Sequence, residues 1–237
     1  MTASGKGGSA RSKAIEWIKA AAWALALWLV LSTFIGQAYF IPSPSMERTL
    51  MVGDVLFVNK FLYGAKLPLV DAHMPAVRDP RRGDIVVFMS PIEDSILVKR
   101  LIGLPGDTLA MRHGALFRNS ERLAEPAAQS LEPDWQLDSA SRYGMRAMHI
   151  AQYAGVDPDS YLPDVHDWGP LVVPMDSLWM MGDNRDRSRD SRFWGFVPRR
   201  NVRGTPVIIY YSWDASSYRP LPFLSAIRWN RLFTVPR

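Results

Sequence analysis

Two side chains far apart in the sequence have the chemistry of a nucleophile and its base. Ser45 lies in a short segment that holds two more hydroxyl residues, Ser43 and Thr49. A serine hydroxyl is a weak nucleophile at its free pKa and needs an adjacent base. Lys99 can serve as that base if burial keeps it neutral, because desolvation disfavours the charged ammonium. The pair would support nucleophilic catalysis.

The pattern around Lys99 also has a purely structural explanation. On a strand with a two-residue period, Lys99 shares a face with Leu97 and Leu101. A lysine on an edge strand protects the strand against aggregation. The local pattern leaves this explanation open beside the catalytic one.

Composition excludes several other kinds of site. The chain has no cysteine, so disulfides, thiolate metal sites and cysteine nucleophiles are absent. The four histidines, His73, His113, His149 and His166, have no metal-binding spacing, and we interpret each as a surface or loop residue. We therefore expect no metal and no cofactor.

The charged loop Gly182–Arg192 allows three interpretations. Asp186, Ser188 and Asp190 have the alternate spacing of a calcium loop, but Val197 stands where the bidentate glutamate belongs, so that interpretation fails. A solvated loop and a rigid platform of opposite charges beside a catalytic strand both remain.

A long uncharged segment precedes the serines. Ala20–Phe40 is 21 residues long, about 30 Å as a helix, which matches a bilayer core. Residues 1–19 contribute +3 of the net charge of +5, so the N-terminus is expected to stay cytoplasmic and lipid is a better partner than nucleic acid. Gly36–Ala38 also fits a signal cleavage site, but the apolar span exceeds a typical signal sequence, which favours a retained anchor.

The remainder predicts a mostly β protein, with an all-β catalytic domain of antiparallel sheets after a single transmembrane helix. Apolar runs separated by Gly and Pro turns predict strands at residues 55–58, 85–89, 95–103, 171–174, 177–181, 193–197 and 207–211. The tail from Ser216 mixes aromatic residues with arginines and suggests an interfacial segment.

The expected organisation has four parts. Residues 1–19 form a basic cytoplasmic N-terminus and 20–40 the transmembrane helix. Residues 41–112 and 171–237 form the catalytic core, and 113–170 form an inserted subdomain without a recognisable motif.

Taken together, four motifs resemble the bacterial type I signal peptidases, in the family's order. They are Ser43-Pro-Ser45-Met46, Arg82-Gly-Asp84, Lys99-Arg-x-x-Gly-x-Pro-Gly-Asp107, and Gly182-Asp-Asn-Arg-x-x-Ser188-x-Asp190-Ser-Arg192. The resemblance implies a membrane-bound serine endopeptidase with a Ser/Lys dyad that cleaves signal peptides from exported preproteins after a small-x-small motif.

The resemblance also implies a role for each matched residue. Ser45 would be the nucleophile and Lys99 the general base; Ser43 would complete the oxyanion hole and Ser188 would orient the lysine. Structural support would come from Asp183, Asp190 and Arg192, and the substrate pocket from Ile41, Met46, Leu50 and Val98.

The resemblance further implies partners and a location. The partners would be signal peptides, membrane lipid and the secretion translocase, with no nucleic acid. The protein would sit in the cell membrane as a single-pass protein with its catalytic domain outside the cytoplasm. Pro44, where the family more often has glycine, and Arg48, where proline is common, depart from the pattern.

Three alternatives differ in function. An autoproteolytic repressor uses the same pair but would need a DNA-binding N-terminus. A dedicated processing peptidase with few substrates fits the same motifs. A non-enzymatic envelope adaptor would tolerate alanine at Ser45 or Lys99.

Overall fold

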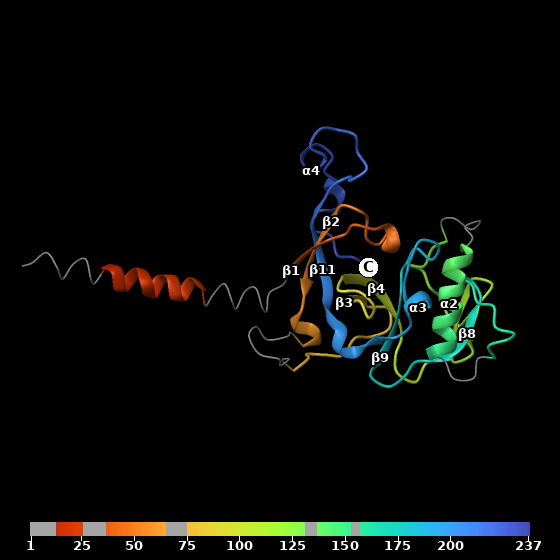
Figure 1. Cartoon of the computed structure of the whole chain (residues 1–237). Helices are drawn as coiled ribbons and strands as arrows, with labels where there is room; N and C mark the ends of the chain where they lie inside the picture. The colour runs from red at the N-terminus through yellow and green to blue at the C-terminus, as the bar shows by residue number, and fades with distance from the viewer. Residues whose placement is uncertain (1–12, 26–36, 65–74, 131–136, 153–156) are drawn as a thin grey trace, which may run out of the picture.

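The chain after residue 36 is built around two antiparallel β-sheets (Figure 1). The structure is a computed structural model that describes residues 13–25, 37–64, 75–130, 137–152 and 157–237. Every strand pair in both sheets is antiparallel. The prediction of a mostly β protein with antiparallel sheets is confirmed.

The larger sheet has seven strands in the order β1-β2-β11-β3-β4-β9-β10. The strands are β1 (Gln37–Phe40), β2 (Asp54–Asn59), β3 (Ile85–Met89), β4 (Ile96–Gly103), β9 (Ser177–Met181), β10 (Val197–Pro198) and β11 (Val202–Ser212). Short helices connect them: η1 (Pro44–Met46), η2 (Phe61–Tyr63), α3 (Ser191–Trp194), η3 (Arg199–Asn201), α4 (Pro222–Ser225) and η4 (Trp229–Arg231).

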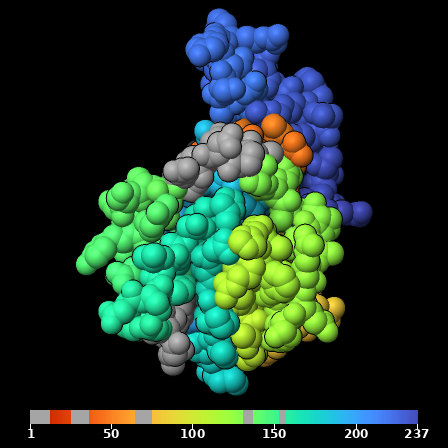
Figure 2. Space-filling model, turned by 90° about the vertical axis from the view of Figure 1, so that its right-hand side faces the viewer, coloured from red at the N-terminus to blue at the C-terminus, as the bar shows by residue number. Residues whose placement is uncertain are grey.

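The smaller sheet has four strands in the order β7-β6-β5-β8. They are β5 (Thr108–Arg112), β6 (Ala115–Arg118), β7 (Glu121–Arg122) and β8 (Trp168–Val172). Helix α2 (Ser139–Gln152) lies on the same side of the molecule (Figures 1 and 2). Its buried Met145 packs into one apolar cluster with Trp168 of this sheet and Trp179 of the larger sheet. The two sheets therefore share a core.

The boundary drawn in the sequence at residue 113 falls inside a hairpin. β5 precedes that boundary and β6 follows it, and the two strands pair from Leu109↔Arg118 to Arg112↔Ala115. Residues 113–170 thus contribute β6, β7 and α2, which pack on β5 and on the end of the larger sheet.

The predicted membrane helix does not extend to residue 40. A helix covers residues 13–25, residues 26–36 lie outside the described residues, and Gln37–Phe40 form strand β1. β1 pairs with β2 over its whole length because an extended backbone satisfies the open edge of that strand. Within the part of the chain that the structure describes, no helix has both the length and the apolar character needed to cross a membrane.

Two further predictions of local structure were wrong. Residues 193–197 were expected to form a strand, but α3 occupies Ser191–Trp194 and only Val197 and Pro198 pair with β9. Asp190 explains the change, since its side chain caps the helix by accepting a hydrogen bond from the Arg192 backbone N–H. Helix α2 was not predicted either, because the segment is polar on average and buries only Met145 and His149.

The C-terminal segment stands at one end of the molecule (Figure 2). It carries several exposed apolar side chains: Tyr218, Leu221, Phe223, Leu224, Trp229 and Phe233. The aromatic character expected from the sequence is therefore on the surface. Arg231 ties the segment back to the body through a bidentate ion pair with buried Asp54.

Candidate active site

Ser45 and Lys99 meet although 54 positions separate them in the sequence. Lys99 Nζ donates a hydrogen bond of 2.5 Å to Ser45 Oγ. Ser45 is the middle residue of η1, a single turn that begins at Pro44, while Lys99 lies in the middle of β4. Both residues are buried, so the contact is protected from bulk water.

Lys99 is not on an edge strand. β4 pairs with β3 on one side, where Val86 faces Lys99, and with β9 on the other. The edge-strand explanation for this lysine is therefore wrong. Lys99 is only 4% exposed, and burial lowers its pKa to about 8, with the positive charge of Arg192 acting in the same direction and the carboxylates of Asp190 and Asp183 opposing it. A substantial neutral fraction near neutral pH is what a lysine base requires.

The hydroxyl of Ser43 lies beside the nucleophile candidate. Ser43 Oγ is 3.5 Å from Ser45 Oγ, and Ser43 has the extended backbone of a residue that precedes a turn. The Ser45 carbonyl is held by the backbone N–H of Asn184 at 3.1 Å. The turn is therefore attached directly to the loop 182–192.

That loop is a buried charged network rather than a solvated segment. Asp190 and Arg192 are both fully buried and form two hydrogen bonds, from Nε to Oδ1 at 2.9 Å and from Nη2 to Oδ2 at 2.8 Å. Burial alone would raise the pKa of Asp190, but the Arg192 charge outweighs it and holds that pKa below its usual value. Asp190 also accepts a hydrogen bond from the Gly182 N–H, which closes the loop on itself.

Ser188 is buried next to the Ser45 backbone. A Cβ added to Gly182 would lie 2.2 Å from Ser188 Oγ and 2.4 Å from the Ser45 carbonyl oxygen. Gly182, the Ser188 hydroxyl and the Ser45 carbonyl are therefore in close contact. Among the described contacts, Ser188 Oγ has no hydrogen-bond partner. A buried hydroxyl without a partner beside a candidate nucleophile is available to a lysine or a substrate.

Asp183 connects the loop to the lysine strand. It accepts two hydrogen bonds from Arg100, at 2.7 and 2.6 Å, and a third from Thr49 Oγ1 at 2.6 Å. Arg100 is the residue directly after Lys99, and Thr49 follows the Ser45 turn. The aspartate therefore connects the Ser45 turn and the Lys99 strand to the same loop.

The segment 125–130, for which the sequence offered no motif, clamps the same loop from outside. The Gln129 backbone exchanges hydrogen bonds with Asp183 and Arg185, at 2.7 and 2.8 Å. The Glu125 carboxylate binds Arg185 through both guanidinium nitrogens, at 2.9 and 2.5 Å. The one available signal was charge complementarity between a lone glutamate and the arginine-rich loop.

The four apolar residues predicted to line a substrate pocket lie together. Ile41, Met46 and Leu50 belong to one buried cluster, and Val98 packs against it. Met46 is 2% exposed and Leu50 is fully buried, so in this conformation both belong to the packed core next to the Ser45 turn.

His73 lies outside the described residues, and the prediction for one of the other three histidines was wrong. His149 is fully buried in α2 rather than on the surface, and its Nε2 lies 2.8 Å from the Arg192 carbonyl oxygen. Burial lowers its pKa to about 4, so it stays neutral at physiological pH. Among the described residues, no group of acidic and histidine side chains is arranged to hold a metal ion.

Comparison with known proteins agrees with this arrangement. Residues 14–213 match the family described as "Signal peptidase, peptidase S26". A signal peptidase I from Pseudomonas fluorescens is 36% identical over 90% of this chain and 78% of its own length. Signal peptidase I from Leptolyngbya laminosa is 35% identical over 85% of this chain and 82% of its own, and signal peptidase I P from Bacillus subtilis subsp. natto 33% identical over 86% and 92%. The chain therefore belongs to the signal peptidase family of serine endopeptidases, peptidase S26.

Proposed function

We propose that this protein is a membrane-bound endopeptidase that removes N-terminal signal peptides from exported preproteins after a small-x-small motif. The observation that carries the proposal is the 2.5 Å hydrogen bond between the buried Lys99 ammonium nitrogen and Ser45 Oγ. A hydroxyl held against a lysine of lowered pKa is the arrangement that nucleophilic catalysis without histidine requires. The names of the related proteins support the substrate class.

Each side chain near the dyad has a role in the proposed reaction. Neutral Lys99 takes the proton of Ser45 as Oγ attacks the carbonyl carbon of the scissile bond. The resulting ammonium then protonates the leaving amine, and water hydrolyses the ester in a second cycle. The Ser45 backbone N–H and the Ser43 hydroxyl would stabilise the oxyanion, and such donors are worth about 3 kcal/mol or more when preorganised. Ser188 would orient the lysine.

Asp183, Asp190 and Arg192 would hold this arrangement rigid. Ile41, Met46, Leu50 and Val98 would surround the small side chains before the cut. Pocket formation by these four requires that the buried cluster opens toward the substrate, since Leu50 has no exposed surface here.

The membrane part of the proposal comes from the N-terminal sequence. Residues 20–36 carry no charge after Lys19, and β1 begins at Gln37. An anchor that ends close to Ser45 would bring the dyad to a signal peptide whose own apolar segment is still in the bilayer. The protein would then be single-pass in the cell membrane, with an anchor that ends before β1, and would act beside the secretion translocase.

The test is cleavage of a purified preprotein by the full-length protein in lipid vesicles. Ser45→Ala removes the nucleophile, and Lys99→Arg keeps the positive charge but cannot deprotonate. Both variants are expected to lose cleavage while keeping the wild-type circular dichroism spectrum. Ser139→Ala, at an exposed serine that begins α2, is the matched control and keeps full activity.

Two outcomes would reject the proposal. Near-normal activity of either dyad variant would show that the dyad is misassigned. Failure of the wild-type protein to cut any preprotein bearing a small-x-small site would exclude general signal peptide removal and favour a narrow processing role or an adaptor.

A further inference from the structure

One end of the larger sheet holds a hollow that the proposed reaction does not use. It has a volume of about 320 Å³ and is bounded by Gln37 and Tyr39 of β1, Gly64 after η2, and Val202 of β11. Ile96 of β4 also lines it, and two cations complete its lining: Lys60, which directly follows β2, and Arg203, near the start of β11. The hollow therefore lies where β1 and β11 begin and where β2 ends.

Lys60 and Arg203 lie close enough to repel each other. Partial burial lowers the pKa of Lys60, and the positive charge of Arg203 lowers it further. Among the described residues, neither cation forms an ion pair with an aspartate or glutamate, and none of the residues lining the hollow is acidic. A bound anion would relieve this repulsion.

Within the described part of the chain, other arginines at the same end of the sheet, unlike Arg203, form ion pairs with carboxylates. Arg78 pairs with Asp84 at 2.7 Å, and Arg199 pairs with Asp79 at 3.1 Å. The contrast shows that carboxylates neutralise neighbouring cations here and that Lys60 and Arg203 are left without one among the described residues. Two unneutralised cations in one concave site are the elements of an anion site.

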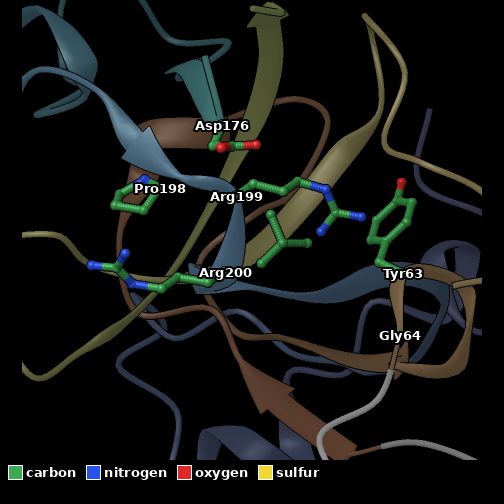
Figure 3. A pocket seen from close by; sticks show the side chains of 7 residues that line it. Tyr63, Gly64, Asp176, Pro198, Arg199 and Arg200 are labelled. Atoms are coloured by element: carbon green, nitrogen blue, oxygen red, sulfur yellow. The ribbon is translucent and has the colours of Figure 1, made fainter. Parts of the chain in front are cut away.

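A second hollow of about 420 Å³ adjoins the first and shares Gly64 and Val202 with it. Figure 3 shows Arg199 pointing across this hollow toward Tyr63, whereas Arg200 points to the opposite side. Arg200 is exposed, and its carbonyl oxygen accepts a hydrogen bond of 3.0 Å from Arg203 Nη1. The backbone of Arg200 therefore lies next to the Arg203 guanidinium and holds it in place at the hollow.

The position of the hollow indicates the source of the anion. Gln37, which lines it, is the first described residue after the segment proposed above as the membrane anchor. A chain that leaves the bilayer at this point places Lys60 and Arg203 at the level of the lipid headgroups. Phosphates of anionic phospholipids are concentrated at that level, and basic side chains attract them.

We propose that the hollow lined by Lys60 and Arg203 binds the headgroup phosphate of an anionic phospholipid and so sets the catalytic domain against the membrane surface. The inference rests on the proposed membrane anchoring. The phosphate would be held between the ammonium of Lys60 and the guanidinium of Arg203. The dyad does not take part.

The test uses the full-length protein reconstituted in phosphatidylcholine vesicles that contain phosphatidylglycerol with a photoreactive headgroup. After illumination, mass spectrometry locates and quantifies the labelled residues. The site variant is Lys60→Gln with Arg203→Gln. The control variant is Arg122→Gln with Arg142→Gln, two exposed arginines on β7 and α2 that give the same change in net charge.

We expect label near Gln37, Lys60 and Arg203 in the wild-type protein and in the control variant. Labelling in the site variant is expected to fall about five-fold for each cation removed, the worth of one basic residue near an anionic surface. Equal labelling in all three proteins would overturn the proposal.

Flotation of the same proteins separates this proposal from the proposed anchor. Flotation with pure phosphatidylcholine vesicles reports the anchor alone. If the protein floats only when phosphatidylglycerol is present, and only with Lys60 and Arg203 intact, the anchor is wrong and the anion site stands. If it floats with neither kind of vesicle, both are wrong.

Discussion

Arg100 donates two hydrogen bonds, of 2.7 and 2.6 Å, to the Asp183 carboxylate. This contact joins β4, which contains Lys99, to the loop 182–192, which contains Ser188 and Asp190. The Asp183 side chain is 1% exposed and that of Arg100 14%. Removing one partner of a buried ion pair leaves the other charge buried without a counter-charge. The protein then loses more stability than the intact pair contributes. This pair therefore has a structural and a catalytic consequence.

Asp183→Asn is expected to destabilise the protein by about 3 kcal/mol or more and to lower kcat, since Arg100 and Thr49 lose their shared acceptor. The measurement is urea unfolding alongside peptide cleavage, both in detergent. Asp79→Asn is the control, because its pair with Arg199 is exposed and is worth about 1 kcal/mol or less. Equal effects of the two substitutions would contradict the assignment.

The cleavage rate is expected to depend on the protonation of Lys99. Its pKa of about 8 means that kcat/KM rises about ten-fold per pH unit below that value and levels off above it. A profile measured with a short peptide substrate checks this. A rate that does not change between neutral and alkaline pH would mean that Lys99 is not the base.

The same pKa shift predicts a stability effect. The pKa of Lys99 is about 8 in the folded protein and 10.5 when unperturbed, so the folded state binds the proton less well. The resulting penalty is complete below pH 8 and disappears as the pH rises to about 10.5, and it amounts to about 3 kcal/mol. Lys99→Met should therefore unfold at higher urea than wild type at neutral pH and lose this advantage at high pH. An advantage that is constant with pH would refute the linkage.

Glu125→Ala is expected to lower kcat about ten-fold, because the loss of a hydrogen bond to a charged group costs about 1.5 kcal/mol or more and frees Arg185 beside the catalytic loop. Glu121→Ala on β7 is the matched control, since that glutamate is exposed. Cleavage kinetics with a saturating peptide would reveal the difference. Identical kcat values for both variants would show that segment 125–130 does not position the loop.

Gly182→Ala should reduce kcat by about 100-fold or more, the effect of a misplacement of about 1 Å. The new methyl group would overlap Ser188 Oγ and the Ser45 carbonyl oxygen, at 2.2 and 2.4 Å. Gly144→Ala in α2 is the control, because nothing lies within 4 Å of its added Cβ and the helix gains about 1 kcal/mol. Wild-type activity in Gly182→Ala would mean that the loop has room to move.

The sequence by itself predicted the mostly β fold and most strands of the larger sheet, because a buried strand needs only a local apolar run. It also predicted the pairing of Ser45 with Lys99 through the family motifs. It failed at α2, which is polar on average and buries few side chains, and at α3, where an aspartate cap decided the structure.

Only the tertiary structure excluded the edge-strand explanation for Lys99, since the place of β4 between β3 and β9 follows from strand order and not from local sequence. The tertiary structure alone also shows that Asp190 and Arg192 are buried and that Glu125 binds the loop 182–192. It alone shows that Lys60 and Arg203 lie together at one end of the sheet. Each depends on contacts between residues that are distant in the chain. Burial, which sets the pKa of Lys99 and the value of each ion pair, is a property of the packed molecule and cannot be read from neighbouring residues.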